Sequence, residues 1–160
     1  MQRVSILCVG KMKERFYMEA AAEYEKRLSR FCKLEIVELP EERLPENPSP
    51  AQIEAALAKE AAAVQSRLPS AAFLIAMCVE GRERSSEELA ALLAQSANQG
   101  ESHIVFLIGS SFGMHPSLKQ LAQVRLSMSP MTFPHHLLRV MLLEQIYRAY
   151  QISAGSRYHK

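Results

Sequence analysis

VFLIGSSFGMHPSL, residues 105–118, is the stretch that decides the fold. Its apolar run stops at Gly109, a second glycine follows at Gly113, and a short helix is expected to begin at Pro116. A buried strand that ends in glycine and leads into a helix is typical of open α/β sheets, which bind ligands at that edge. The stretch therefore predicts an α/β fold with a binding loop at residues 109–113, although two glycines also suit a turn without a ligand.

Apolar runs of similar length recur along the chain and alternate with helical patterns. Together with the run at 103–108, they are expected to form strands at residues 4–9, 34–39, 73–79 and 125–129. This alternation predicts βαβ units and a mostly parallel sheet of five to six strands with helices on both faces. Because a chain of 160 residues suits one hydrophobic core, residues 1–160 are expected to form a single domain.

Local signals mark where helices begin. Ser49 with Gln52, and Ser85 with Glu88, have the spacing of capping boxes. Residues 80–82 are expected to form the turn before the second of these helices. In the first helix of the chain, the expected inward face recurs every four residues as Phe16, Ala20, Tyr24 and Leu28, and the expected solvent-side pair is Glu23 with Arg27.

Composition argues against several classes of protein. The three cysteines are scattered without Cys-x-x-Cys spacing, so we expect reduced thiols in a cytoplasmic protein that holds no metal. No apolar run approaches the roughly 18 residues that span a membrane, and the N-terminus lacks a signal-peptide pattern. With a net charge of +2, neither a membrane nor DNA is an expected partner. Basic residues do gather near the C-terminus, as Arg139, Arg148, Arg157, His159 and Lys160.

A second unusual stretch, LSMSPMTFPHHLLR at residues 126–139, suits neither a strand nor a helix. Its small polar side chains can bond to the local backbone and its prolines stiffen the turn, which leaves backbone amides and carbonyls for the heterocycle of a ligand. The alternative is an ordinary strand-to-helix turn in which methionines fill gaps.

The helix expected at residues 137–152 is apolar around most of its circumference. Such a helix must be buried on two sides, so we expect one side to face the sheet and the other to face a second copy of the chain. Glu144 and Arg148 are four residues apart on its narrow polar strip and are expected to pair.

The chain resembles the bacterial ribosomal RNA large subunit methyltransferase H family, whose members are small SPOUT-class enzymes. The resemblance covers nearly the whole chain and rests on VSILCVGKMKERF, EYEKRL, the two glycines at 109 and 113, SMSPMTFPHHLLRV, LLEQIYRAYQI and the terminal GSRYHK. It implies a C-terminal deep trefoil knot, S-adenosylmethionine as methyl donor, and a homodimer. It also implies methylation of N3 of a pseudouridine in the helix 69 loop of 23S rRNA, and because the charge of the chain is small we expect the assembled 70S ribosome to be the substrate.

The resemblance also assigns residues. Three loops would hold the cofactor through Met77, through Gly109, and through Met128, Ser129, Pro130, Met131, Thr132 and Phe133. The catalytic candidates are His135, Tyr158 with His159, and Arg148, because methyl transfer to N3 needs loss of the imide proton and favours a base or a cation nearby. The alternatives are a helix-start histidine, a frayed tail and a simple pair with Glu144.

One position departs from the family, which commonly has two adjacent glycines where this chain has Gly109 followed by Ser110. If the second position required a positive φ, Ser110 would be strained by roughly 1 kcal/mol and its Cβ would narrow the cofactor site. Such a loss would favour a noncatalytic ribosome-binding or assembly factor. A SPOUT-class tRNA ribose methyltransferase is the nearer alternative, and a small flavodoxin-like nucleotide protein is the third.

Overall fold

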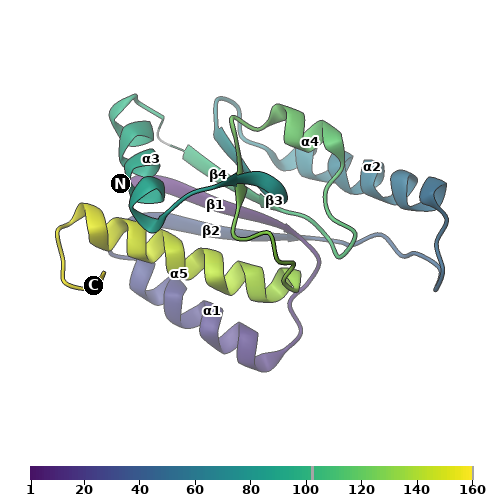
Figure 1. Cartoon of the computed structure of the whole chain (residues 1–160), viewed down its shortest axis with the longest axis horizontal. Helices are drawn as coiled ribbons and strands as arrows, with labels where there is room; N and C mark the ends of the chain where they lie inside the picture. The colour runs from purple at the N-terminus through teal and green to yellow at the C-terminus, as the bar shows by residue number, and fades with distance from the viewer. Residues whose placement is uncertain (102, 160) are drawn as a thin grey trace.

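Five parallel strands form the central sheet of the computed structural model, which describes residues 1–101 and 103–159. The strands are β1 (Gln2–Val9), β2 (Cys32–Leu39), β3 (Phe73–Glu83), β4 (His103–Ile108) and β5 (Val124–Ser127). Their order is β2-β1-β4-β3-β5, and every neighbouring pair is parallel; Figure 1 labels the first four strands. The predicted α/β class and parallel sheet are therefore confirmed, with five strands in the described part of the chain.

Helices cover both faces of the sheet, so the strands are apolar on both sides. One face carries α1 (Arg15–Leu28), α3 (Ser86–Asn98) and α5 (His135–Ser153); the other carries α2 (Pro50–Arg67) and α4 (Pro116–Leu121). In β4, Phe106 packs toward the first set and Leu107 toward the second. Because β4 leads into α4 whereas β3 leads into α3, the chain leaves these neighbouring strands toward opposite faces, and a crevice opens at their carboxyl ends.

Both predicted capping boxes are present, on Ser49 with Gln52 and on Ser85 with Glu88. The expected turn at residues 80–82 is wrong, because β3 continues to Glu83. Leu126 of β5 pairs with both Met77 and Arg82, so the residues between those two bulge out of the strand. The glycine at position 81 allows a close approach between backbones: a Cβ there would lie 2.8 Å from the Arg125 carbonyl carbon.

The inward face of α1 differs from the prediction by one residue at its start. Phe16 is 64% exposed, and its ring packs against Tyr17 with 4.4 Å between the centroids. Tyr17 and Ala21 take the inward positions that Phe16 and Ala20 were expected to fill. A strict four-residue spacing drifts around a helix of about 3.6 residues per turn, so positions 17, 21, 24 and 28 share one face better than 16, 20, 24 and 28 do. The solvent-side pair of Glu23 and Arg27 is confirmed, at 3.2 Å.

Helix α5 lies between α1 and α3 above the sheet (Figure 1). These two helices cover much of the apolar circumference that led us to expect a second copy, with Leu142, Leu143 and Ile146 fully buried within one chain. The homodimer and the trefoil knot stay predictions, since strand order does not fix how the chain is threaded. None of the described helices is both long enough and apolar enough to span a membrane.

Candidate functional site

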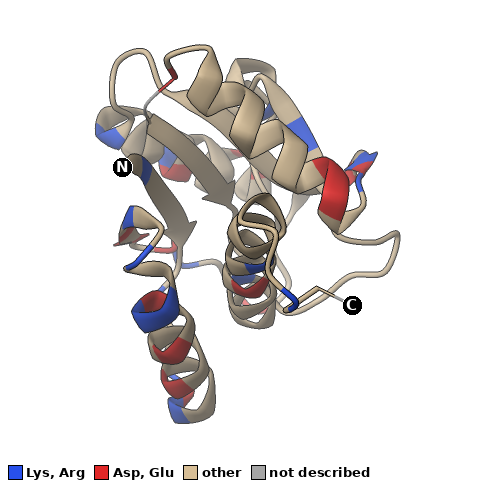
Figure 2. Cartoon of the chain, turned by 90° about the vertical axis from the view of Figure 1, so that its left-hand side faces the viewer, with Lys and Arg blue, Asp and Glu red and all other residues tan. Residues whose placement is uncertain are grey.

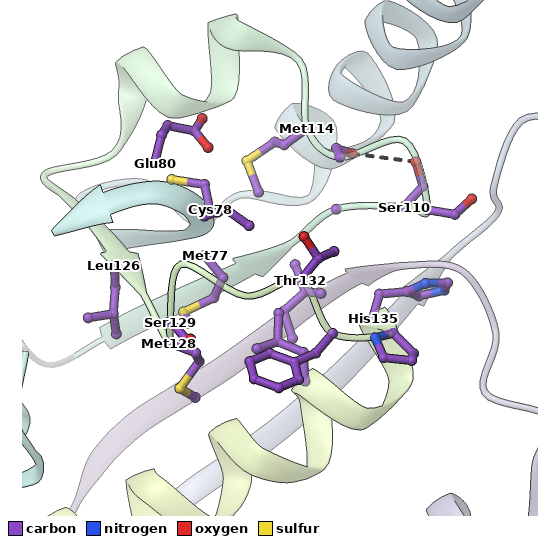
Figure 3. A pocket seen from close by; sticks show the side chains of 18 of the residues that line it. Met77, Cys78, Glu80, Ser110, Met114, Leu126, Met128, Ser129, Thr132 and His135 are labelled. Atoms are coloured by element: carbon purple, nitrogen blue, oxygen red, sulfur yellow. Dashed lines mark hydrogen bonds between the residues drawn. The ribbon is translucent and has the colours of Figure 1, made fainter. Parts of the chain in front are cut away.

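A pocket of about 510 Å³ lies at the carboxyl ends of β3, β4 and β5. Three segments line it: the bulge that follows Met77, the turn at residues 109–114, and the connection at residues 128–135 between β5 and α5. Figure 3 shows side chains of all three segments around one space. The crevice that strand order predicts is therefore a real cavity built from the two stretches that the sequence marks as unusual.

The turn after β4 explains both of its glycines. Ser110 and Gly113 exchange two backbone hydrogen bonds, of 3.1 and 2.8 Å, which close the turn. A Cβ at Gly109 would lie 2.3 Å from the carbonyl oxygen of Gly113, so no larger residue fits there. Gly113 itself has a φ of +92°, which favours glycine. The glycines thus serve turn geometry, and the turn they make is a wall of the pocket.

The strain considered for Ser110 is absent. Among the described residues, the only non-glycine residue with positive φ is Ala71. Ser110 is 7% exposed and its hydroxyl donates to Oε1 of Glu60 in α2, at 2.9 Å. The positive φ that the turn needs falls on Gly113, so the departure at position 110 costs no strain and adds a hydrogen bond.

The segment after β5 is held by its own side chains. The hydroxyl of Ser127 donates to the Ser129 carbonyl at 3.0 Å, and the Met131 amide donates to the Ser129 hydroxyl at 3.0 Å. Of the six cofactor candidates in this segment, all but Pro130 line the pocket; they are Met128, Ser129, Met131, Thr132 and Phe133. With Met77 and Gly109 they surround the same space, as Figure 3 shows for the labelled ones. Pro130 lies in the same tight turn without lining the pocket.

His135 is the one catalytic candidate that lines this pocket. Its ring packs on Gly10, where an added Cβ would lie 3.2 Å from Nε2, and that nitrogen is buried without a hydrogen-bond partner among the described residues. Burial, and then the adjacent His136, lower the pKa of His135 below its ordinary value. A neutral imidazole can accept a proton at one of its two ring nitrogens, and in His135 the Nε2 is enclosed against Gly10.

The other three catalytic candidates do not line the pocket; they form a cluster on α5. Arg148 donates to Oε1 of Glu144 at 2.6 Å and to Nδ1 of His159 at 3.0 Å, and its guanidinium lies 4.9 Å from the centre of the Tyr158 ring. His159 Nε2 in turn lies 2.6 Å from a carboxylate oxygen of Glu87. The expected pair of Glu144 and Arg148 is therefore confirmed, and the C-terminal tail folds back on its own helix.

Arg139 does not belong to a basic surface. It is 4% exposed, and its Nη1 lies 2.7 Å from Oε2 of Glu38 while its Nη2 donates to the Gly10 carbonyl at 3.3 Å. Burial alone would raise the pKa of Glu38, but hydrogen bonds from the Met12 amide and from Arg139 lower it. Figure 2 shows basic and acidic residues interspersed along the ribbon, and Lys160 lies outside the described residues.

Sequence reasoning missed several residues of the pocket wall, among them Cys78 and Glu80 from the bulge of β3 and Lys119 from α4. Lys119 and Glu80 form an ion pair at the edge of the pocket. Burial raises the pKa of the Cys78 thiol, and the charge of Glu80 adds to the effect. The signal was the glycine at position 81, which marks a bulge as well as a turn.

The pocket offers thioethers, backbone groups and one neutral imidazole. Met77, Met114 and Met128 give it polarisable apolar walls, and the turns supply amides and carbonyls. Such a lining fits a flat heterocycle with polar edges better than a highly charged phosphate. Among the residues that the structure describes, no group of three or more His, Cys, Asp or Glu could hold a metal ion.

Comparisons with known proteins agree with this geometry. Residues 2–159 match the sequence model of a family described as "Predicted SPOUT methyltransferase". The chain is 46% identical over 158 residues to ribosomal RNA large subunit methyltransferase H of Bifidobacterium adolescentis, and 44% identical over 158 residues to the protein of that name from Streptococcus uberis, with 99% of each chain covered.

Solved structures show the same fold at low sequence identity. A probable methylase family protein from Haemophilus influenzae matches 98% of this chain and 70% of its own, with a TM-score of 0.54 and 12% identity. A putative methylase family protein from Neisseria gonorrhoeae matches 90% of this chain and 81% of its own, with a TM-score of 0.52 and 16% identity. On the family match and these full-length relatives, the chain belongs to the SPOUT methyltransferase family.

Proposed function

We propose that this chain is an S-adenosylmethionine-dependent methyltransferase of 23S rRNA. Its target is N3 of a pseudouridine in the helix 69 loop, and it acts in the cytoplasm on the assembled ribosome as a homodimer. The observation that carries the proposal is the convergence of three separate segments, at residues 77–80, 109–114 and 128–135, on one pocket. The names of the full-length relatives support the choice of large-subunit rRNA as substrate.

The pocket fits the proposed methyl donor. Backbone groups beside Gly109 and Ser129 would hold the adenine, and Met77, Met128 and Phe133 would pack on its apolar parts. Gly109 has no room for a Cβ because Gly113 lies against it, so the turn that forms this wall of the pocket is tightly closed. When bound, the donor supplies an electrophilic methyl group on a sulfonium.

His135 has the features of a proton acceptor for the imide N3–H. Its imidazole lines the pocket, and its lowered pKa keeps it neutral at pH 7. A neutral histidine can receive the proton that N3 loses as the carbon–nitrogen bond forms. We assign this role to His135.

We assign Arg148 of α5 and the tail residues Tyr158 and His159 a role in the dimer. Glu144 of α5 and Glu87 of α3 hold them, and they do not line the pocket of their own chain. A second copy is the source that would bring a tail to the pocket, where Arg148 stabilises the negative charge of the imidate or of an RNA phosphate. In this proposal the homodimer completes the site.

The small net charge supports a large, preformed substrate. A chain with a charge of +2 has few contacts to offer naked RNA, whereas assembled ribosomal surfaces supply more of them. The backbone strain that would favour the noncatalytic alternative is absent at Ser110, whose hydroxyl donates to Glu60.

Two measurements test this function. Titration calorimetry with S-adenosylmethionine and with its demethylated product should show binding of both, and no binding would contradict the proposed donor. Incubation with labelled donor should then methylate ribosomes in preference to free 23S rRNA or tRNA. Equal labelling of ribosomes and free rRNA would contradict the proposed substrate, and labelling of a tRNA ribose would favour the tRNA methyltransferase alternative.

A further inference from the structure

A buried carboxylate lies behind the pocket. Glu60, in the middle of α2, is 5% exposed. Charged side chains are rarely buried to this extent unless they have specific partners. The position of Glu60 therefore calls for a structural or functional reason.

Its two carboxylate oxygens bind two different segments. Oε1 accepts the hydroxyl of Ser110 at 2.9 Å, and Oε2 accepts the backbone amide of Glu42 at 2.9 Å. One side chain of α2 thus joins the turn after β4 to the loop after β2. Burial raises the pKa of Glu60, and these two hydrogen bonds oppose that rise.

The hydrogen bond from Ser110 to Glu60 is made at the most tightly constrained part of the 109–113 turn. Ser110 exchanges backbone hydrogen bonds with Gly113, and its hydroxyl also lies 3.4 Å from the Gly113 carbonyl. On the other side, Gly109 is so close to Gly113 that a Cβ would not fit. A shift of Ser110 therefore moves the whole wall that faces the pocket.

We propose that Glu60 is a positioning residue that fixes, through Ser110, the shape of the 109–113 turn required for binding of the methyl donor. The inference rests on the proposed function for the identity of the ligand. A serine at position 110 gives the turn a side-chain donor that glycine would lack, so in this chain Ser110 and Glu60 act as one unit.

Four variants test the unit by calorimetry with the demethylated donor product at 25 °C. Ser110→Ala and Glu60→Ala each remove one partner and should weaken binding about tenfold, the cost of one unpaired buried group. The double variant should be about as weak as either single one, because the interaction is already lost. Glu60→Gln should bind within about twofold of wild type, since Ser110 can accept from the amide while Glu42 donates to its oxygen.

The matched control is Ser66→Ala, which removes an exposed hydroxyl of the same helix that bonds only to the Ala63 carbonyl. It should leave affinity unchanged. Thermal unfolding of every variant distinguishes an effect on stability from an effect on binding. Ser110→Ala and Glu60→Ala variants that unfold more easily but bind with wild-type affinity at 25 °C would overturn the proposal.

Amide hydrogen exchange without any ligand gives an independent result. In Ser110→Ala the Gly113 amide, which donates to the Ser110 carbonyl, should exchange about tenfold faster than in wild type. Failure of the wild type to bind would contradict the proposed cofactor, and the exchange rate would then decide whether Glu60 holds the turn. An unchanged rate would overturn that role as well.

Discussion

Arg139 of α5 and Glu38 of β2 form an ion pair, with 2.7 Å between Nη1 and Oε2, although 101 residues separate them in the sequence. Arg139 also donates to the carbonyl of Gly10, the residue on which the His135 ring packs. Because residues four apart lie on the same face of a helix, the pair holds the first turn of α5, and His135 with it, against the end of β1.

Arg139→Met should destabilise the protein by about 2–4 kcal/mol, because it leaves the Glu38 carboxylate without its cation. The Arg139 side chain is buried, and that of Glu38 is one-third exposed. Urea unfolding at pH 7 measures the difference. Arg27→Met, which breaks an exposed pair with Glu23, is the control and should cost less than about 1 kcal/mol.

The same pair predicts a dependence on pH. The pKa of Glu38 is lower in the folded protein than in the unfolded chain, so its contribution is complete above the unfolded value and is lost as pH falls through the folded one. The stability difference between wild type and Arg139→Met should therefore shrink in acid, below the ordinary range of a glutamate. A difference that stays constant from neutral to acid pH would mean that the loss is packing alone.

Gly109→Ala and Gly113→Ala should differ in severity. The first places a Cβ 2.3 Å from the Gly113 carbonyl oxygen and must distort the turn, so we expect more than tenfold weaker binding of the donor. The second meets open space and costs only the strain of a positive φ, roughly 1 kcal/mol. Calorimetry and thermal unfolding together measure both effects, and equal losses in the two variants would contradict this account of the turn.

The cysteines predict a labelling pattern. Burial raises the pKa of Cys8 to about 12 and that of Cys32 to about 11, so neither should react with a maleimide in the folded protein. Cys78 is partly exposed on the pocket wall and should react slowly. Saturation with the demethylated donor product should protect it, as mass spectrometry of the labelled peptides would show. Unprotected Cys78 under saturating ligand would place the ligand elsewhere.

His135→Gln should lower kcat about 10²-fold or more while changing the affinity for the donor little, because the imidazole is assigned to the proton of the substrate. The lowered pKa of His135 means that the wild-type rate should persist below the ordinary range of histidine and fall only at lower pH. The variant should lose that dependence. His103→Gln, at the amino end of β4, is the control.

Local signals in the sequence predicted local structure well. The strand at 103–108 and the two capping boxes depend on residues within a few positions of each other, and all are confirmed. Position 81 was misread because glycine permits a tight turn and a close backbone approach equally, and only the partner strand distinguishes them.

Contacts between distant residues were beyond the sequence. From the sequence, Arg139 looks like one more surface base. In the fold it is buried and paired with Glu38, which lies 101 residues earlier. Glu60 looks like one acid among several in a helix, and its bond to Ser110 spans 50 residues. The sequence could name the loops of the pocket, but the groups that hold those loops in place became visible only in the fold.

Methylation of a pseudouridine on the ribosome can be followed directly from the donor to the modified nucleoside. Ribosomes that lack the modification are incubated with the protein and labelled S-adenosylmethionine, and the nucleosides of the isolated helix 69 fragment are analysed by mass spectrometry. We expect the label in a base-methylated pseudouridine. This label should be absent when Gly109→Ala replaces the wild type. Label on a ribose, label only in tRNA, or no label from a folded, donor-binding protein would contradict it.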